Sequence, residues 1–230
     1  MQLTSEILPD LIKAVAEIIE QNAEEVTLLD QVIGDGDHVT NLQRGIDALI
    51  PLNAELAQMD WTQALHKIGM TLLSTMGGAS GSLFGTLFIS MSKAVGDKAD
   101  ISSSNFSDIF TQGVEAVKKR GKSDAGEKTM LDVLIPVAES IKLGVDTSMT
   151  LPDLLERICQ AAIEGMESTR DMLATKGRAS YMEEKSIGHI DAGARTSQLM
   201  ICAIVEILQE QVQGERRTVE PVLALLTLYL

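Results

Sequence analysis

Residues 30–38 of the chain read DQVIGDGDH, so that three carboxylates and two glycines fall within eight consecutive positions. Two like charges about 4 Å apart repel by roughly 4 kcal/mol at an effective dielectric constant of about 20. Carboxylates this close therefore either splay into solvent or share a bound cation. The two glycines allow the tight backbone turn that would bring Asp30, Asp35 and Asp37 together. The pattern predicts a hard-cation site with oxygen ligands, and a solvated acidic turn is the alternative.

The identity of the cation follows from what the loop lacks. A calcium EF-hand loop that began at Asp35 would need an oxygen ligand at its fifth position, Gly at its sixth and Glu at its twelfth. Those positions hold Val39, Thr40 and Ile46, which excludes the EF-hand. Mg²⁺ is usually bound by one or two carboxylates, with water and substrate phosphates completing its shell. The three aspartates are enough for one or two Mg²⁺ ions that also bind phosphate.

Three further segments combine small and basic residues in patterns that suit an anionic ligand. Residues 76–85, MGGASGSLFG, would present free backbone N–H groups before a helix, although small residues also allow close helix packing. Residues 121–130, GKSDAGEKTM, come close to a P-loop, but an intervening Glu127 breaks the G-x-x-x-x-G-K-[ST] pattern. Residues 176–181, KGRASY, form a basic group in an acidic chain, which a helix C-terminus would also explain.

Apolar residues recur every three or four positions along the chain, which indicates helices. Because the connections between the periodic segments are short, neighbouring helices are expected to be antiparallel. Residues 97–105 are predicted to be a surface loop, and residues 174–193 a longer connection that covers the site as a lid. The sequence thus predicts an all-α protein with helices near residues 4–22, 38–50, 60–75, 80–95, 106–120, 128–144, 151–173 and 194–212.

Composition narrows the class of protein. The formal net charge of −14 argues against nucleic-acid binding, because phosphates require a basic surface. Hydrophobic residues make up 45% of the chain and aromatic ones only 3%, which predicts an aliphatic, Met-rich core. No apolar run reaches the length of a membrane span and no signal peptide is apparent, so a cytoplasmic protein is expected. Cys159 and Cys202 are then expected to be buried free thiols.

Together the segments resemble one family, the L subunit of dihydroxyacetone kinase (DhaL), which is the nucleotide-binding half of that enzyme. The resemblance covers roughly residues 1–212 and implies an antiparallel eight-helix barrel with the nucleotide and Mg²⁺ site at one end. Residues 213–230 remain as an apolar C-terminal tail without an assigned role. The matching motifs are Gly34–His38 with Thr40, Asn41, Arg44 and Gly45, Gly77–Gly81 with Gly85 and Thr86, Arg120–Lys122, Lys128–Met130, Lys176–Tyr181 and Ser186–His189.

The resemblance also implies roles for individual residues. Asp30, Asp35 and Asp37 would bind Mg²⁺, most simply two ions, and would act in catalysis together with Arg178. Residues that would contact the nucleotide, as ADP or ATP, are His38, Val39, Thr40, Asn41, Gly78, Ala79, Ser80, Gly121, Thr129, Met130, Arg178, Asp191, Ala192 and Gly193.

Three positions depart from the family pattern. Val39 stands where Gly is usual, Ser82 where Pro is usual, and Ala192 where Asp-Pro-Gly is usual. Val39 matters most, because a β-branched residue would be strained if the position required a positive φ. The departures leave the three aspartates untouched and concern the shape of the nucleotide pocket.

The activity that the resemblance implies is half of a phosphotransferase. Bound ADP would be rephosphorylated by a phosphohistidine protein of a phosphoenolpyruvate-dependent relay, and the phosphoryl group would pass to dihydroxyacetone on a partner K subunit. Two alternatives stay open: an ATP-dependent kinase half acting on dihydroxyacetone or a related short sugar, and a regulatory module whose nucleotide state a transcription factor reads. A homodimer is compatible with each of them.

Overall fold

The computed structural model describes residues 4–96 and 101–227, and within helices it leaves out the side chains of residues 103, 104 and 213–227. The described residues form helices and turns and contain no β-strand, as the periodicity predicts. The elements are η1 (Ser5–Ile7), α1 (Leu8–Gln21), α2 (Ala23–Ile33), α3 (His38–Leu49), η2 (Ile50–Leu52), α4 (Asn53–Leu56), α5 (Trp61–Thr75), α6 (Gly78–Val95), α7 (Ser103–Gly121), α8 (Leu131–Asp146), α9 (Leu151–Ser168), η3 (Thr169–Asp171), η4 (Arg178–Ser186) and α10 (Ala192–Thr227).

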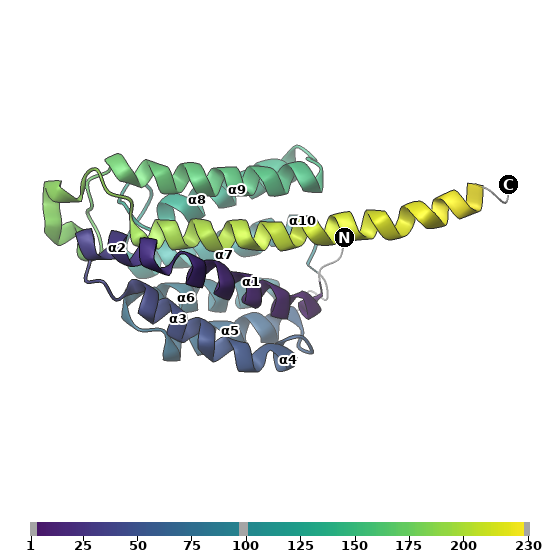
Figure 1. Cartoon of the computed structure of the whole chain (residues 1–230), viewed down its shortest axis with the longest axis horizontal. Coiled ribbons are helices and arrows are strands. Elements are labelled where there is room, and N and C mark those ends of the chain that lie inside the picture. Colours follow the sequence, from purple (N-terminus) through teal and green to yellow (C-terminus); the bar gives the residue numbers. More distant parts are fainter. Residues whose placement is uncertain (1–3, 97–100, 228–230) are drawn as a thin grey trace.

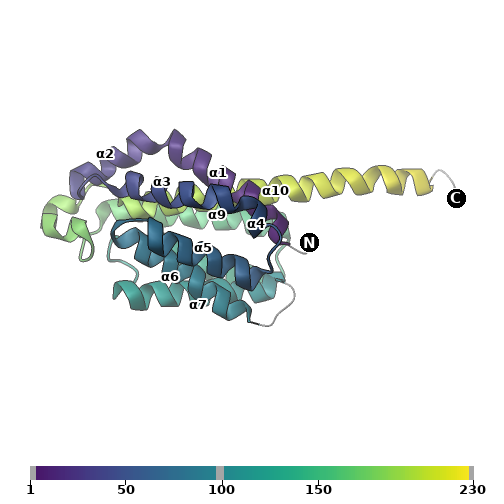
Figure 2. The same ribbon diagram turned by 90° about the horizontal axis from the view of Figure 1, so that it is seen from below.

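Eight long helices close into a ring. Helix α1 packs against α3, α3 against α5, and the remaining helices follow in chain order until α10 returns to α1. Figures 1 and 2 show that neighbouring helices of this ring run in opposite directions, while α10 continues well beyond the barrel. The predicted antiparallel eight-helix barrel is confirmed, and α2 and α4 are additions to it.

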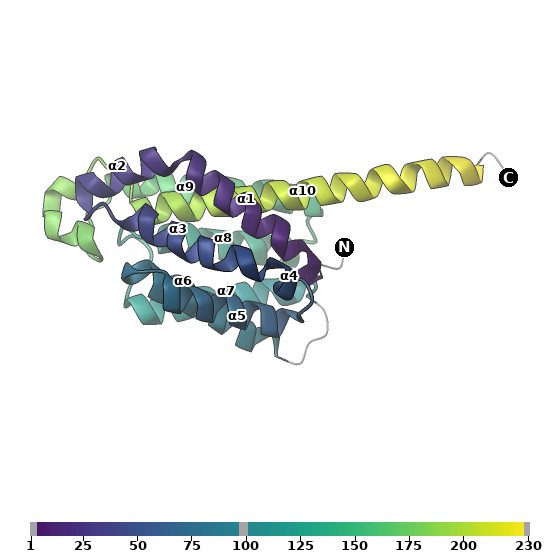
Figure 3. The same ribbon diagram turned by 60° about the horizontal axis from the view of Figure 1, so that its bottom comes forward.

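Antiparallel order places four helix N-termini at one end of the barrel. Helices α3, α6, α8 and α10 all begin at the end where α2 and η4 lie, as Figures 1 and 3 show. Unpaired backbone N–H groups and the positive ends of four helix dipoles therefore converge there. The backbone alone therefore makes this end of the barrel electropositive and suited to binding an anion.

Capping residues account for several helix starts. Asp60 accepts a hydrogen bond from Gln63 N (2.8 Å) at the start of α5, and Ser102 accepts one from Asn105 N (3.2 Å) at the start of α7. Thr150 caps α9 in the same way. Because α7 already begins at Ser103, the predicted loop 97–105 is wrong at its end, while residues 97–100 lie outside the described part of the chain.

The barrel interior is aliphatic and contains buried methionines, as predicted from the composition. An apolar cavity of about 360 Å³ lies within it, lined by side chains from the surrounding helices. No helix in the described residues is both long and apolar enough to cross a membrane.

The two cysteines correct one expectation. Cys159 on α9 and Cys202 on α10 form a disulfide, with Cα atoms 5.0 Å apart, so the predicted free thiols are wrong. The pairing could not be predicted from the sequence, because the cysteines are 43 positions apart. Only the packing of α9 against α10 brings them together.

Candidate functional site

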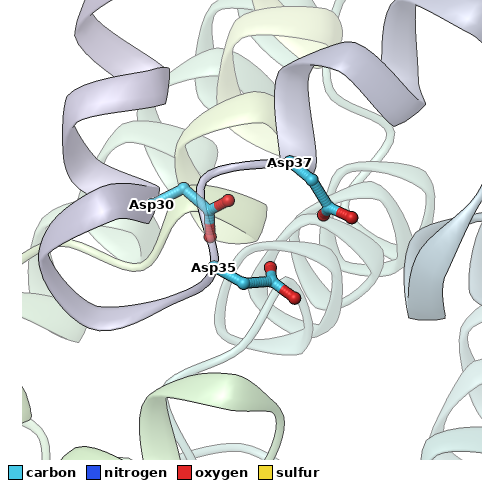
Figure 4. A group of neighbouring side chains, drawn as sticks. All are labelled: Asp30, Asp35 and Asp37. Carbon is cyan, nitrogen blue, oxygen red and sulfur yellow. The ribbon is translucent and has the colours of Figure 1, made fainter.

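The acidic loop connects α2 to α3. Asp30 lies in the last turn of α2, and Asp35 and Asp37 follow in the connection. Gly34 ends α2 with φ −130° and ψ −145°, and Gly36 adopts a positive φ of 74°. The three side chains turn toward one another (Figure 4), and each offers a carboxylate oxygen within 4.8 Å of the others. The loop therefore gathers the predicted ligands, as the glycine pattern indicates.

Asp30 is held in place from both sides of the loop. Its Oδ2 accepts a hydrogen bond from the backbone N–H of His38 (3.0 Å), the first residue of α3. Helix α2 is itself fastened to α10, because Arg195 makes a two-pronged ion pair with Glu25 at 3.0 and 2.8 Å. The carboxylate cluster is thus attached to two helices of the barrel as well as to its own loop.

His38 joins three elements at the floor of the site. Its Nδ1 lies 3.2 Å from Ser80 Oγ on α6, and its Nε2 lies 2.9 Å from Thr196 Oγ1 on α10. Burial lowers the pKa of His38 from its ordinary value, although the three nearby aspartates oppose that shift. A neutral imidazole is therefore favoured at neutral pH, and both of its ring nitrogens have hydroxyl partners.

A cavity of about 380 Å³ opens beside the carboxylates. Residues from the beginnings of all four converging helices line it, including His38, Gly78, Leu131 and Ala192. Small residues at the start of α6 leave its first backbone N–H groups accessible, which suits a phosphate. The cavity therefore combines an acidic cluster with four electropositive helix ends.

Arg178 begins η4, the short helix on the segment between α9 and α10. Its Nε lies 3.0 Å from Asp35 Oδ2. The side chains of Arg178 and Asp35 are 70% and 39% exposed, so this ion pair contributes little stability by itself. The predicted lid thus lies over the acidic loop with its cation facing the candidate metal ligands.

The opposite wall of the cavity holds a second polar network. The side chain of Asp191 caps α10 by accepting a hydrogen bond from Ala194 N (2.8 Å), and burial raises its pKa to about 6. Lys128 is only 1% exposed, and burial lowers its pKa although Asp191, Asp171 and Asp132 counteract the shift. These charged groups lie next to the backbone that forms the pocket wall.

Most of the predicted site residues meet at this cavity. Two do not: Val39 packs into the barrel core and Thr40 is exposed on α3. Those that line the cavity are Asp30, Asp35, Asp37, His38, Asn41, Gly78, Ala79, Ser80, Gly121, Thr129, Met130, Arg178, Asp191, Ala192 and Gly193.

The departures from the family pattern are accommodated locally. Val39 lies within α3 and is not among the residues with positive φ, so the strain considered for it does not arise. Ser82 accepts a hydrogen bond from Arg120 Nε at 2.7 Å, which links α6 to α7 at the cavity wall. Ala192 is the first residue of α10 and is buried directly after the capping Asp191.

Sequence reasoning gave no role to several lining residues. Arg120 and Lys176 add positive charge to the cavity, and Lys128 lies in its wall. Arg120, Lys128 and Lys176 stand in motifs that were recognised, but no residue spacing indicates that a lysine at position 128 is buried. Its positive φ of 60° and the carbonyl groups around it become visible only in the folded chain.

The donor set of the acidic loop fits Mg²⁺. It offers carboxylate oxygens alone, with no sulfur or imidazole nitrogen among the clustered ligand atoms. Hard cations prefer such ligands, and Mg²⁺ in particular leaves coordination positions to water and phosphate. The neighbouring cavity provides the space in which a phosphate ligand would complete that shell.

Fold and site together define an α-helical barrel with an acidic site among converging helix N-termini at one end. The family model described as the DAK2 domain matches residues 32–206. The chain belongs to the DAK2 domain family.

Two curated relatives align with this chain over most of their own length. The PEP-dependent dihydroxyacetone kinase 1, ADP-binding subunit DhaL, of Listeria innocua is 42% identical over 190 residues, which are 83% of this chain and 90% of that protein. The corresponding subunit of Escherichia coli K12 is 40% identical over 185 residues, 80% of this chain and 88% of the relative.

A solved structure supports the fold independently. The crystal structure of the dihydroxyacetone kinase of C. freundii matches with a TM-score of 0.69 and 22% identity. The match covers 87% of this chain and 34% of that one. At this identity the likeness concerns the helical barrel alone.

Proposed function

We propose that the chain is the ADP-binding subunit of a phosphoenolpyruvate-dependent dihydroxyacetone kinase. ADP would remain bound as a cofactor and would be rephosphorylated by a phosphohistidine protein, which exchanges its P–N bond for a P–O bond on the terminal phosphate. The same phosphoryl group would then pass to dihydroxyacetone held by a K subunit. The relatives at 42% and 40% identity, which are named as ADP-binding subunits of such kinases, support this assignment.

One observation carries the proposal: three clustered carboxylates border a cavity into which four helices point their N-termini. Carboxylates alone would repel a diphosphate, and helix N-termini alone would bind many anions. A nucleotide diphosphate with its divalent cation satisfies both features at once, because the cation pairs with the carboxylates and the phosphates pair with the backbone N–H groups.

The chain's own residues would position and neutralise the phosphates. Asp30, Asp35 and Asp37 would hold Mg²⁺, and we propose two ions because three carboxylates exceed the one or two that a single Mg²⁺ usually takes. Bound Mg²⁺ supplies charge neutralisation at the transferring phosphoryl group. Backbone N–H groups at the start of α6 would orient the phosphates, and Arg178 would pair with their outward-facing oxygens.

The wall beside α7 and α8 would hold the base and ribose. Gly121 and Met130 border this part of the cavity, and Thr129 lies next to them. Because the cavity opens at the end of the barrel, the terminal phosphate would face outward. Donor protein and K subunit would approach there in turn. We place the protein in the cytoplasm, in keeping with its acidic composition, where the Cys159–Cys202 disulfide would be an exception to the usual reduced state of cysteines.

The test is reconstitution of the reaction from purified proteins. The chain is combined with a K subunit and the phosphohistidine relay proteins, and dihydroxyacetone phosphate is measured with either phosphoenolpyruvate or ATP as the donor. We expect turnover with phosphoenolpyruvate and the relay, and no turnover from the chain without the K subunit. Turnover without the K subunit would contradict the proposal.

Two other outcomes identify the alternatives. Multiple turnover with ATP and no relay proteins would indicate an ATP-dependent kinase half. Binding of MgADP without phosphoryl transfer under any condition would favour a regulatory role, in which a transcription factor reads the nucleotide state. Native mass spectrometry before and after EDTA treatment first establishes whether ADP and Mg²⁺ are bound together.

A further inference from the structure

Lys128 has an environment that is unusual for a lysine. It is the largest fully buried side chain among the described residues, and its backbone adopts a positive φ of 60°. Burying an ammonium group is unfavourable unless hydrogen bonds and opposite charges compensate for the lost hydration. The hydrogen bonds that Lys128 makes show which parts of the chain this side chain connects.

The ammonium group connects two distant parts of the chain. Lys128 Nζ donates hydrogen bonds to the carbonyl oxygens of Thr169, directly after α9, and of His189, shortly before α10. Burial lowers the pKa of Lys128, while the negative charges of Asp191, Asp171 and Asp132 act in the opposite direction and favour its charged form. One side chain thus bridges the turn before α8 and both ends of the segment between α9 and α10.

That segment is a closed loop whose ends lie side by side. Gly188 N donates to Arg170 O at 2.7 Å, and Asp191 N donates to Thr169 Oγ1 at 3.1 Å. We call residues 170–188 the Arg178 loop, because they carry that arginine at the start of η4. The two carbonyls that Lys128 contacts flank the loop on either side, so Lys128 ties its base to the pocket wall.

The turn that carries Lys128 is itself held by hydrogen bonds to a side chain. The carboxylate of Asp132 accepts hydrogen bonds from Gly126 N (2.5 Å) and Thr129 N (2.7 Å). Thr129 belongs to the cavity wall, so the same turn contributes to the pocket and anchors the loop. A displacement of Lys128 would therefore change the placement of Arg178 relative to the pocket.

We propose that Lys128 is a positioning residue, which fixes the base of the Arg178 loop and thereby sets where Arg178 meets the phosphates of the bound nucleotide. The effect on nucleotide affinity rests on the proposed function. The effect on the loop itself does not, because the contacts of Lys128 are present in the protein alone.

The first experiment measures the loop without nucleotide. Lys128→Met keeps an unbranched side chain of similar length and removes the donors. Hydrogen exchange is expected to become at least about tenfold faster in residues 172–188 of this variant, because their closure at the base is lost. Leu154→Ala is the matched control, since it removes core packing at the opposite end of the barrel and is expected to leave this segment protected. Unchanged exchange in Lys128→Met would overturn the proposal.

The second experiment is a double-mutant cycle on MgADP affinity, measured by calorimetry. Lys128→Met is expected to weaken binding about tenfold in the presence of Arg178 and less than twofold in the Arg178→Ala background. Equal losses in both backgrounds would show that Lys128 does not act through Arg178. If the methionine variant does not fold, Lys128→Gln, which keeps an amide donor, replaces it in the same double-mutant cycle. If the unmodified chain binds no MgADP, the proposed function fails, whereas the hydrogen-exchange result still decides the role of Lys128.

Discussion

At the scale of single residues, the acidic loop carries a free-energy cost of charge repulsion, which a bound divalent cation would remove. Asp30, Asp35 and Asp37 bring three negative charges within 4.8 Å, and Arg178 partly offsets one of them. Repulsion of this kind amounts to a few kcal/mol near a protein surface. Binding of a divalent cation replaces this repulsion with attraction, which couples the metal to any phosphate that shares it.

Asp37 tests this coupling most directly. Asp37→Asn removes one ligand charge without touching the Arg178–Asp35 pair, so the dissociation constant for ADP in the presence of Mg²⁺ should rise at least about tenfold, or roughly 1.4 kcal/mol. Calorimetry with and without EDTA measures it. In EDTA the variant should bind ADP no more weakly than the unmodified chain, because one carboxylate fewer then repels the phosphates.

The control is Asp146→Asn, which makes the same charge change at the C-terminal end of α8, far from the acidic loop. It should leave the affinity for MgADP unchanged. A tenfold loss in this control as well would mean that net charge, and not metal coordination, governs binding.

Asp191 predicts a pH dependence of stability. Its pKa is raised to about 6 in the folded state, so the folded chain binds this proton more tightly than the unfolded chain does. Its contribution to stability is therefore complete below about pH 4 and is lost as the pH rises through about 6. Between pH 5 and pH 8 the loss should be about 1.4 kcal/mol.

Asp191→Asn provides the comparison, because the amide oxygen can still cap α10 while the side chain no longer ionises. Urea unfolding of both proteins in EDTA should show the free energies of unfolding converging toward pH 5 and the variant gaining relative stability toward pH 8. A difference between the two proteins that is constant across this range would contradict the raised pKa.

Residue patterns predicted the clustered aspartates but not the residues that hold them in place. Asp30, Asp35 and Asp37 were recognisable because close carboxylates and glycines are local features of the sequence. The cavity wall followed from the resemblance, except that Val39 and Thr40 point elsewhere. Lys128 received no role, because its burial depends on carbonyls that lie 41 and 61 positions away.

At the scale of elements, regular helices were predictable and short ones were not. Seven of the eight predicted helices start within three residues of helices that the structure contains, near residues 38, 60, 80 and 151 for example. Helix α2 was missed because it buries few residues, with Leu28 and Val32 exposed, so that its apolar period is weak. Helix α8 begins at Leu131 and not near 128, because the preceding turn contains Lys128 in a left-handed conformation.

The disulfide between α9 and α10 links two helices and should stabilise the fold. It closes a loop of 43 positions, and the loop-entropy model gives about 4 kcal/mol for a cross-link of that span. A reductant should therefore lower the free energy of unfolding by up to about 4 kcal/mol, as measured by urea unfolding.

The Cys159→Ala/Cys202→Ala variant is the matched control and should not respond to the reductant. Titration of thiols in the denatured, unreduced chain should find none. Two reactive thiols under those conditions would show that the cysteines are free in solution, as the sequence first suggested.

At the scale of the whole molecule, ring closure explains why the site lies at one end. Eight helices in antiparallel order place their N-termini alternately at the two ends, so four meet at the acidic loop. Periodicity alone predicts helices without saying which of them are neighbours across the ring. The return of α10 to α1 was available only through the family resemblance.

The C-terminal part of α10 provides the last prediction. The family model ends at residue 206, the last of the described residues that line the cavity is Gly193, and α10 projects past the barrel in Figure 1. Removing residues 213–230 should therefore leave the dissociation constant for MgADP within about twofold, and the melting temperature within about 2 °C, of the values for the full chain. Calorimetry and thermal unfolding of the two proteins measure these quantities at equal concentration. A large drop in melting temperature would show that residues 213–230 stabilise the barrel. Weaker MgADP binding at an unchanged melting temperature would mean that they reach the nucleotide site.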